Sequence, residues 1–205
     1  VTATNLSGKE QSVDVTVKVW TLEHPDRPFR QRKWGEPDQF LLTKAQHKTR
    51  FYNDPFADEH DFRNWEKGKN MLDTKFKTNG TAKANFKPLN GLSAGRYLVE
   101  ITAKDAFGTE VKQQQYYTLY GEDDGKTPIL TTNWLNVKKS TLEPGDDLEL
   151  LFGSSYEDVE ARLQIEVKDQ GRNTNRIVYD ELIKVSSSTQ RLSIPVTEEW
   201  RGNAQ

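Results

Sequence analysis

Three histidines are the only imidazoles in the chain, so metal binding or imidazole acid–base catalysis would have to involve them. None of His24, His47 and His60 stands in the HExxH spacing of a zinc site. Residues 58–61 (DEHD) have the composition of a ligand cluster, but neighbouring residues on a short helix point in different directions. We therefore expect a surface helix cap at this position, with no metal and no cofactor.

The serines and carboxylates do not form a hydrolase pattern. Ser154 and Ser155 follow Gly153 without the G-x-S-x-G elbow, and no histidine comes after them to act as a base. Acidic residues such as Glu160 and Glu166 occupy alternating positions that face water in a strand, where they increase solubility. No glycine-rich phosphate loop is present. The sequence predicts a protein that is not an enzyme.

An aromatic-rich excursion between residues 24 and 70 offers a different chemistry, which is ligand stacking. Trp34, Tyr52 and Trp65 lie in it, and exposed rings of this kind stack on the apolar faces of sugars. The same rings also serve to pack a long excursion onto a thin β-sandwich, and we favour this packing role. A carbohydrate-binding or adhesive module pair is the alternative.

Composition narrows the possible partners. The 205 residues carry a net charge of −2 with both signs spread along the chain, which argues against a nucleic-acid or anionic-membrane surface. The absence of cysteine excludes disulfides, thiol chemistry and cysteine–zinc sites. There is no transmembrane run and no signal peptide. Because the chain starts inside a strand pattern without Met, we expect an excised piece of a larger protein.

Alternating apolar and polar residues predict antiparallel strands. In residues 92–109 (LSAGRYLVEITAKDAFGT), the odd positions from Tyr97 to Ala103 form an inward face. The even positions face water and include Glu100, with Leu98 as the apolar exception. Residues 109–120 return as the second strand of a hairpin. Further strands are expected at 13–19, 72–78 and 81–87, with a hairpin turn at residues 79–80 (NG).

The excursion at 24–70 breaks this alternation with prolines and charges. We expect one short helix capped by Asp38 and running to about Gln46, with Phe40, Leu41 and Ala45 facing inward. A second short helix is expected over residues 57–67, ended by Gly68. The insertion of the first domain is thus predicted to be partly helical.

A polar segment at 121–127 divides the chain. Its acidic residues lack the EF-hand pattern, so we interpret it as a solvated linker. The second half repeats the strand pattern at 129–137, 148–152, 159–167, 177–185 and 191–196, with Pro195 indicating an edge strand. Five strands are fewer than the seven or so of an immunoglobulin-like sandwich, so we expect one or two more beyond Gln205.

Three ordered patterns resemble the macroglobulin domains of the bacterial α2-macroglobulin family. They are NLSGKE with VDVTVKVWTLEHPDRP and RKWGEPD, then LSAGRYLVEITAKDAFG, then STLEPGDDLELLFGSS followed by LSIPVTEEWRGN. The resemblance implies an all-β fold of two tandem fibronectin- or immunoglobulin-like antiparallel β-sandwich domains. These are 1–120 with its excursion, and 128–205, which we expect to be truncated at its C-terminal end.

The resemblance also implies a function, that of non-catalytic structural modules in an endopeptidase inhibitor that traps proteases. Many members carry a thioester built from Cys and Gln, which this cysteine-free chain cannot form, and no bait segment is apparent. The implied partners are neighbouring macroglobulin domains and, through the whole protein, target proteases. The implied location is the bacterial envelope (periplasmic, outer-membrane-anchored or extracellular), with membrane attachment only through an anchor outside this segment.

Overall fold

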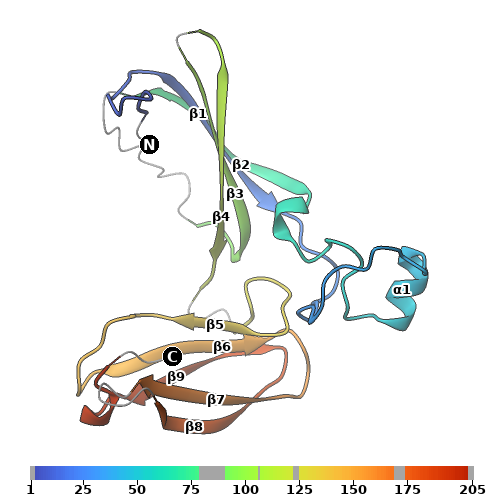
Figure 1. Ribbon diagram of the computed structural model, residues 1–205, viewed down its shortest axis with the longest axis vertical. Helices are drawn as coiled ribbons and strands as arrows, with labels where there is room; N and C mark the ends of the chain where they lie inside the picture. Colours follow the sequence, from blue (N-terminus) through green and yellow to red (C-terminus); the bar gives the residue numbers. More distant parts are fainter. Residues whose placement is uncertain (1–2, 79–90, 106, 122–124, 169–173, 203–205) are drawn as a thin grey trace. The chain divides into compact units, whose positions relative to one another are not determined.

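The computed structural model describes residues 3–78, 91–105, 107–121, 125–168 and 174–202. The described chain consists mainly of antiparallel strands, which confirms the all-β prediction (Figure 1). By its internal contacts the chain divides into two compact units, residues 1–25 with 57–121 and residues 26–56 with 122–205. The predicted turn at 79–80, the strand at 81–87 and much of the linker lie outside the described residues.

The units differ from the predicted domains in one segment. The break after residue 121 falls at the start of the predicted linker, but the excursion is divided: residues 26–56 group with the second half of the chain and residues 57–70 with the first. The Tyr156 hydroxyl donates a hydrogen bond to the Pro28 carbonyl at 3.2 Å, 128 residues away in the chain. Hydropathy patterns along the sequence cannot predict a contact between residues so far apart in the chain.

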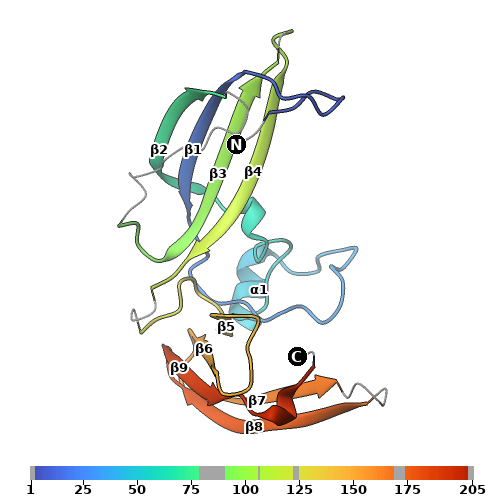
Figure 2. The same cartoon turned by 90° about the vertical axis from the view of Figure 1, so that its left-hand side faces the viewer.

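The first unit contains one four-stranded sheet in the order β2-β1-β3-β4, seen face-on in Figure 2. Every neighbouring pair is antiparallel. Val15, Val17 and Val19 of β1 are 2%, 1% and 2% exposed, as the alternation predicted. The strands are β1 (Asp14–Leu22), β2 (Lys67–Lys77), β3 (Gly95–Lys104) and β4 (Glu110–Leu119).

One face prediction for β3 is wrong. Glu100 was expected to face water but is only 7% exposed, and Leu98 on the same side is 2% exposed. The carboxylate tolerates burial because Lys67 and Lys112, on the two outer strands of the sheet, supply opposite charges. Of the four residues predicted to face inward, Tyr97 is 3% exposed, whereas Val99, Ile101 and Ala103 are only partly buried. Alternation therefore grouped the residues of each face but did not predict which face is buried.

The second unit contains a three-stranded sheet, β5-β6-β9, and a two-stranded sheet, β7-β8. Leu150 and Ile194 from the first sheet and Ile165 from the second form one buried cluster, so the two sheets share a hydrophobic core. The edge position of β9 confirms the prediction from Pro195. The strands are β5 (Trp134–Val137), β6 (Asp147–Ser154), β7 (Val159–Lys168), β8 (Asn175–Val185) and β9 (Ser188–Pro195), so β5 is shorter than predicted.

The first predicted helix begins later than expected. Helix α1 spans Lys44–Arg50, and its N-cap is Thr43, not Asp38. The Thr43 hydroxyl accepts from the Gln46 amide while the Gln46 side chain accepts from the Thr43 amide, a reciprocal capping box that fixes the start. The inward prediction is wrong for Phe40 and Leu41, which are 44% and 91% exposed, and for Ala45, which is also exposed.

The second predicted helix is reduced to a single 3₁₀ turn, η1 (Phe62–Asn64), capped by Asp61. Ala57 has a positive φ of 52°, which a helix cannot contain. Gly68 lies inside β2 and does not end a helix. A further 3₁₀ turn, η3 (Glu198–Trp200), follows β9. Among the described residues, no helix has the length and apolarity needed to cross a bilayer.

Candidate functional site

The three histidines do not all belong to one unit. His24 and His60 belong to the first unit and His47 to the second. In the described part of the chain, no three potential metal ligands of the histidine, cysteine or carboxylate type come together. The predicted cap at residues 58–61 is present, because Asp61 accepts hydrogen bonds from the Arg63 amide and guanidinium. The side-chain bond from Arg63 lowers the pKa of Asp61 to about 2.

The paired serines have structural roles. Ser154 is fully buried, and its hydroxyl accepts from the Tyr156 amide at 3.1 Å. The Ser155 hydroxyl lies 2.7 Å from that of Thr127 and accepts from the Thr131 amide at 3.0 Å. Neither hydroxyl is presented as a nucleophile. Gly153 before them lets β9 approach closely, since a Cβ there would lie 2.8 Å from the Ser188 carbonyl oxygen.

The buried carboxylate of the first unit is fully engaged. Glu100 lies 2.8 Å from the Lys67 ammonium and 2.6 Å from that of Lys112, and it accepts from the Gln114 amide at 3.0 Å. Lys67 in turn lies 5.5 Å from the centre of the Trp20 ring. The Glu100 carboxylate therefore links side chains of β2, β3 and β4. Because each of its oxygens already contacts a lysine ammonium, neither is free to act as a general base.

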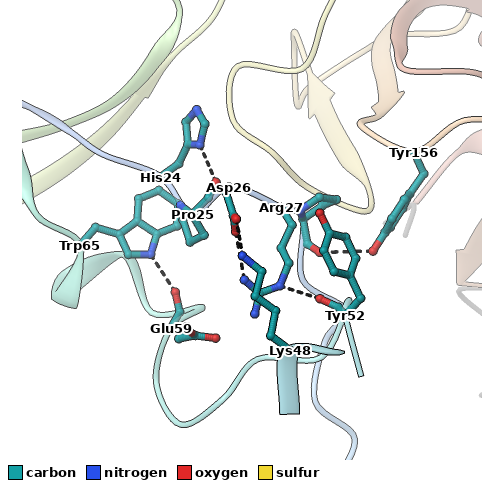
Figure 3. A network of polar contacts seen from close by, with 10 residues as sticks. His24, Pro25, Asp26, Arg27, Lys48, Tyr52, Glu59, Trp65 and Tyr156 are labelled. Carbon is teal, nitrogen blue, oxygen red and sulfur yellow. Dashed lines mark hydrogen bonds and ion pairs between the residues drawn. The ribbon is translucent and has the colours of Figure 1, made fainter. Parts of the chain in front are cut away.

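The second unit holds a more promising feature, which is the part of the predicted excursion that belongs to it, residues 26–56. From here on, the excursion means these residues. Figure 3 shows its anchor: Arg27 donates to the Tyr52 carbonyl at 2.6 Å and to the Asp26 carboxylate, which also pairs with Lys48. Arg27 is only 5% exposed, with its guanidinium 4.7 Å from the centre of the Phe29 ring. The hydrogen bonds from Lys48 and then Arg27 lower the pKa of Asp26, so this carboxylate stays ionised.

Two stretches of the excursion run beside each other and form its walls. The Arg30 amide donates to the Asn53 carbonyl at 2.8 Å, and the Arg30 side chain donates to Asp54 at 2.9 Å. Further along, Arg32 donates to the Pro55 carbonyl at 2.8 Å. Charge-assisted bonds of this kind hold a segment that has no strand ladder of its own.

His47 of helix α1 belongs to an aromatic cluster in the same excursion. The rings of Phe40 and Phe56 lie 4.5 Å apart, and the His47 ring lies 5.3 Å from Phe51 and 5.5 Å from Phe56. These separations are typical of favourable ring packing. These ring contacts hold parts of the excursion together, while Phe40 and Phe51 remain 44% and 45% exposed.

A pocket of about 420 Å³ opens in this excursion. One part of its wall is aromatic, with Trp34, Phe40 and Phe51. The other part is strongly charged, with three cations and one carboxylate: Arg30, Arg32, Lys33 and Asp54. His47 also lines it. The combination of apolar rings and excess positive charge suits a ligand with an apolar body and anionic groups.

The three residues proposed for stacking differ in their surroundings. Trp34 lines the pocket with 76% of its surface exposed. Tyr52 belongs to the same unit and is 52% exposed, but it does not line the pocket. Trp65 belongs to the other unit, and its indole N–H donates to the Glu59 carbonyl at 3.0 Å. Only Trp34 of the three therefore contributes to the pocket.

Sequence reasoning missed most of the pocket. His47 was considered only for metal binding or acid–base catalysis, and Phe40 only as an inward-facing residue of a misplaced helix. The signal that could have found the site is the interleaving of cations and aromatics in residues 27–34 (RPFRQRKW). This mixture is unusual for a buried segment and typical of a binding surface, where Arg and Trp are enriched.

Comparisons of the chain with protein-family models, with curated proteins and with solved structures find no match. Its function is therefore inferred from its residues and their geometry.

Proposed function

We propose that this chain is a pair of non-catalytic modules from the body of a bacterial α2-macroglobulin-like protein that traps proteases. Each module would be a fibronectin- or immunoglobulin-like β-sandwich. The observation that carries the proposal is the ordered set of three sequence patterns that resemble macroglobulin domains. The role would be mechanical, holding neighbouring domains in position while the whole protein engages its protease in the bacterial envelope.

The positions of these patterns in the fold support the proposal. In NLSGKE the Asn5 side chain accepts hydrogen bonds from the Ser7 and Lys9 amides, which makes a turn before β1. LSAGRYLVEITAKDAFG contains β3, and STLEPGDDLELLFGSS contains β6. The resemblance thus involves turns and the strands that follow them, which are the parts of a sandwich that determine its topology.

The charged residues of the sheets support a structural role too. Lys18 pairs with Asp73 across β1 and β2, and Arg162 pairs with Asp180 across β7 and β8. These pairs lie on partly exposed strand positions, where cross-strand charges stabilise a sheet modestly. Side chains held in such ion pairs stabilise the sheets, which fits a structural role better than a catalytic one.

The test uses the longer protein that the proposal requires, mixed with a general endoprotease and separated on native and denaturing gels. Entrapment should give a compact native species that contains the protease. The present chain should be recovered uncut within that species, because β-sandwich modules resist cleavage while a bait segment does not. Digestion at scattered sites with no compact species would reject the trapping function.

The alternative, a carbohydrate-binding module pair, has less support. Of the three rings proposed as its platform, only Trp34 lines the pocket. The indole N–H of Trp65 is also already used within the chain. A glycan array probed with this chain tests the alternative, and binding that Trp34→Ala and Trp65→Ala both abolish would favour it.

A further inference from the structure

We infer that strand β4, at the outer edge of the four-stranded sheet, pairs with β4 of a second copy of this chain to form one continuous antiparallel sheet. Gln115 would lie on the two-fold axis, opposite Gln115 of the second copy. The inference concerns an interaction surface of the first unit. It does not depend on the trapping function proposed above.

The outer side of β4 is open to another strand. β4 is the last strand in the order β2-β1-β3-β4, and no strand in the part of the chain that the structure describes pairs with its outer side (Figure 2). Its pairing with β3 runs without a register shift from Glu110 to Leu119. A long, regular edge presents a row of unpaired backbone N–H and C=O groups, and such a row is a template for another strand.

The two edges of the sheet differ in how they are protected. Along β2, at the opposite edge, Lys69, Lys75 and Lys77 are exposed, and the register with β1 shifts at two places. Exposed lysines and bulges are common means by which proteins keep an edge strand from pairing. β4 (EVKQQQYYTL) has a single lysine, Lys112, whose ammonium lies 2.6 Å from the Glu100 carboxylate. The sequence therefore protects β2 from pairing but leaves β4 able to pair.

An apolar row crosses the sheet and ends uncovered on β4. Val15 of β1, Ala103 of β3 and Val111 of β4 lie side by side. Val15 is 2% exposed and Ala103 is partly buried, whereas Val111 is 60% exposed. Tyr117 and Leu119 share the face of Val111 and are 49% and 37% exposed. A further strand beside β4 would shield these side chains from water.

The apolar residues of β4 complement one another when two copies run antiparallel. Opposite residues of an antiparallel pair share a face, so the apolar row continues across the pair only if odd positions lie opposite odd positions. With Gln115 on the two-fold axis, Val111 lies opposite Leu119 of the second copy, and residues 111–119 of each strand are paired. Contacts between opposite apolar side chains are a main source of sheet stability.

The charges of β4 also allow the strand to pair with itself. Glu110 and Lys112 are its only charged residues, and both lie near its first residue. The two strands start at opposite ends of the pair, so Lys112 lies opposite Thr118 of the second copy and no charge of β4 faces a like charge. A second copy therefore supplies both the apolar row and the charge pattern that this edge needs. Two-fold dimers of this self-complementary kind are the commonest soluble oligomers.

The first test is sedimentation velocity of the full 205-residue chain at concentrations from about 5 to 500 μM. We expect a reversible dimer with a Kd between about 10 and 500 μM, because one strand edge gives a small interface. Gln115→Lys should weaken dimerisation about fivefold, since two lysines then face each other on the axis. Gln115→Glu should do the same, and an equimolar mixture of the two variants should dimerise within about twofold of the unchanged chain.

Gln113→Lys is the matched control for Gln115→Lys. Both glutamines are exposed on the same face of β4, but Gln113 lies opposite Tyr117 of the second copy, so the new lysines do not face each other. Dimerisation of this variant should stay within about twofold of the unchanged chain.

Cysteine crosslinking tests the register directly, because the chain has no cysteine of its own. Gln115→Cys places two thiols on opposite residues, whose Cα atoms lie about 4.5–5.5 Å apart, a distance that a disulfide spans. Mild oxidation should therefore give a disulfide-linked dimer. The two thiols of Gln113→Cys would lie about 13 Å apart along the strands, and crosslinking should be at least about fivefold slower. Lys75→Cys, at the exposed opposite edge, measures the rate of random collision.

Several results would overturn the inference. These are a chain that stays monomeric at about 500 μM, equal effects of Gln113→Lys and Gln115→Lys, or equal crosslinking of Gln113→Cys and Gln115→Cys. Faster crosslinking of Lys75→Cys than of Gln115→Cys would place the interface on β2 and also reject it. If a charged variant loses its circular dichroism signal, the cysteine variants decide, because they add no charge.

Discussion

At the scale of single residues, Glu100 shows how a charge can be buried in this small sheet. Burial alone would raise the pKa of this carboxyl, but hydrogen bonds from Lys112, Lys67 and Gln114 outweigh burial and lower the pKa to about 2, from an ordinary value of 4.5. A group with a lower pKa in the folded state stabilises the fold above its unfolded pKa. Its contribution is therefore present above pH 4.5 and is lost as the pH falls toward 2.

Glu100→Gln should accordingly destabilise the first unit by on the order of 2 kcal/mol at pH 7, as measured by urea unfolding. The difference from the unchanged chain should shrink between pH 4.5 and pH 2, where the native carboxyl itself becomes protonated. Glu160→Gln is the matched control, because Glu160 pairs with Lys184 while 60% exposed, and no measurable change is expected. A destabilisation of Glu100→Gln that is equally large at pH 2 would show that packing, and not charge, is responsible.

The burial of Glu100 could not be predicted from its own strand. Alternation correctly placed Tyr97 on the inward face, which is 3% exposed. It could not reveal that a lysine from β2, two strands away, would reach Glu100. Single-strand patterns specify which residues share a face, whereas the partners on that face depend on strand order and register.

At the scale of elements, α1 depends on its first turn. It has seven residues, which is too short to be stable without capping and packing. Thr43→Ala removes one side of the capping box and should cost about 0.5–2 kcal/mol in local stability. Hydrogen exchange of the α1 amides measures this loss as faster exchange.

Thr49→Ala is the matched control for Thr43→Ala. It makes the same chemical change in the same segment, but the Thr49 hydroxyl donates only to the Ala45 carbonyl one turn earlier. Removing a bond of that kind leaves a helix unchanged or slightly more stable. Equal acceleration of exchange in both variants would mean that threonine content, and not the cap, determines the stability of α1.

Elements differed in how well the sequence predicted them. Strands with sustained alternation, such as β1 and β7, were predicted closely because burial of one face enforces the two-residue period. The helices were misplaced because several capping residues compete in the excursion, and a capping box at Thr43 prevailed over Asp38. The pocket was missed for a related reason: its walls come from irregular chain, which has no period to detect.

At the scale of the whole molecule, the assignment of residues 26–56 to the second unit makes a prediction that the sequence alone would not make. A sequence-based boundary cuts the chain near residue 121 and leaves the excursion with the first domain. The structure instead gives it a partner in Tyr156, whose hydroxyl donates to the Pro28 carbonyl. Burial raises the pKa of that hydroxyl, which keeps it a neutral donor across the physiological pH range.

Removal of residues 122–205 should therefore expose the excursion while the four-stranded sheet of the first unit remains folded. Trypsin should cut between residues 27 and 50, which contain many Arg and Lys, about tenfold faster in a chain of residues 1–121 than in the full chain. Sites within β1 and β3 serve as the internal control and should be cut at the same rate in both chains, because their partners are retained. Mass spectrometry of the early fragments distinguishes the two classes of site. Equal protection of residues 27–50 in both chains would show that the anchor of Arg27, Asp26 and Lys48 holds the excursion without residues 122–205, and the domain boundary predicted from the sequence would then be the better description.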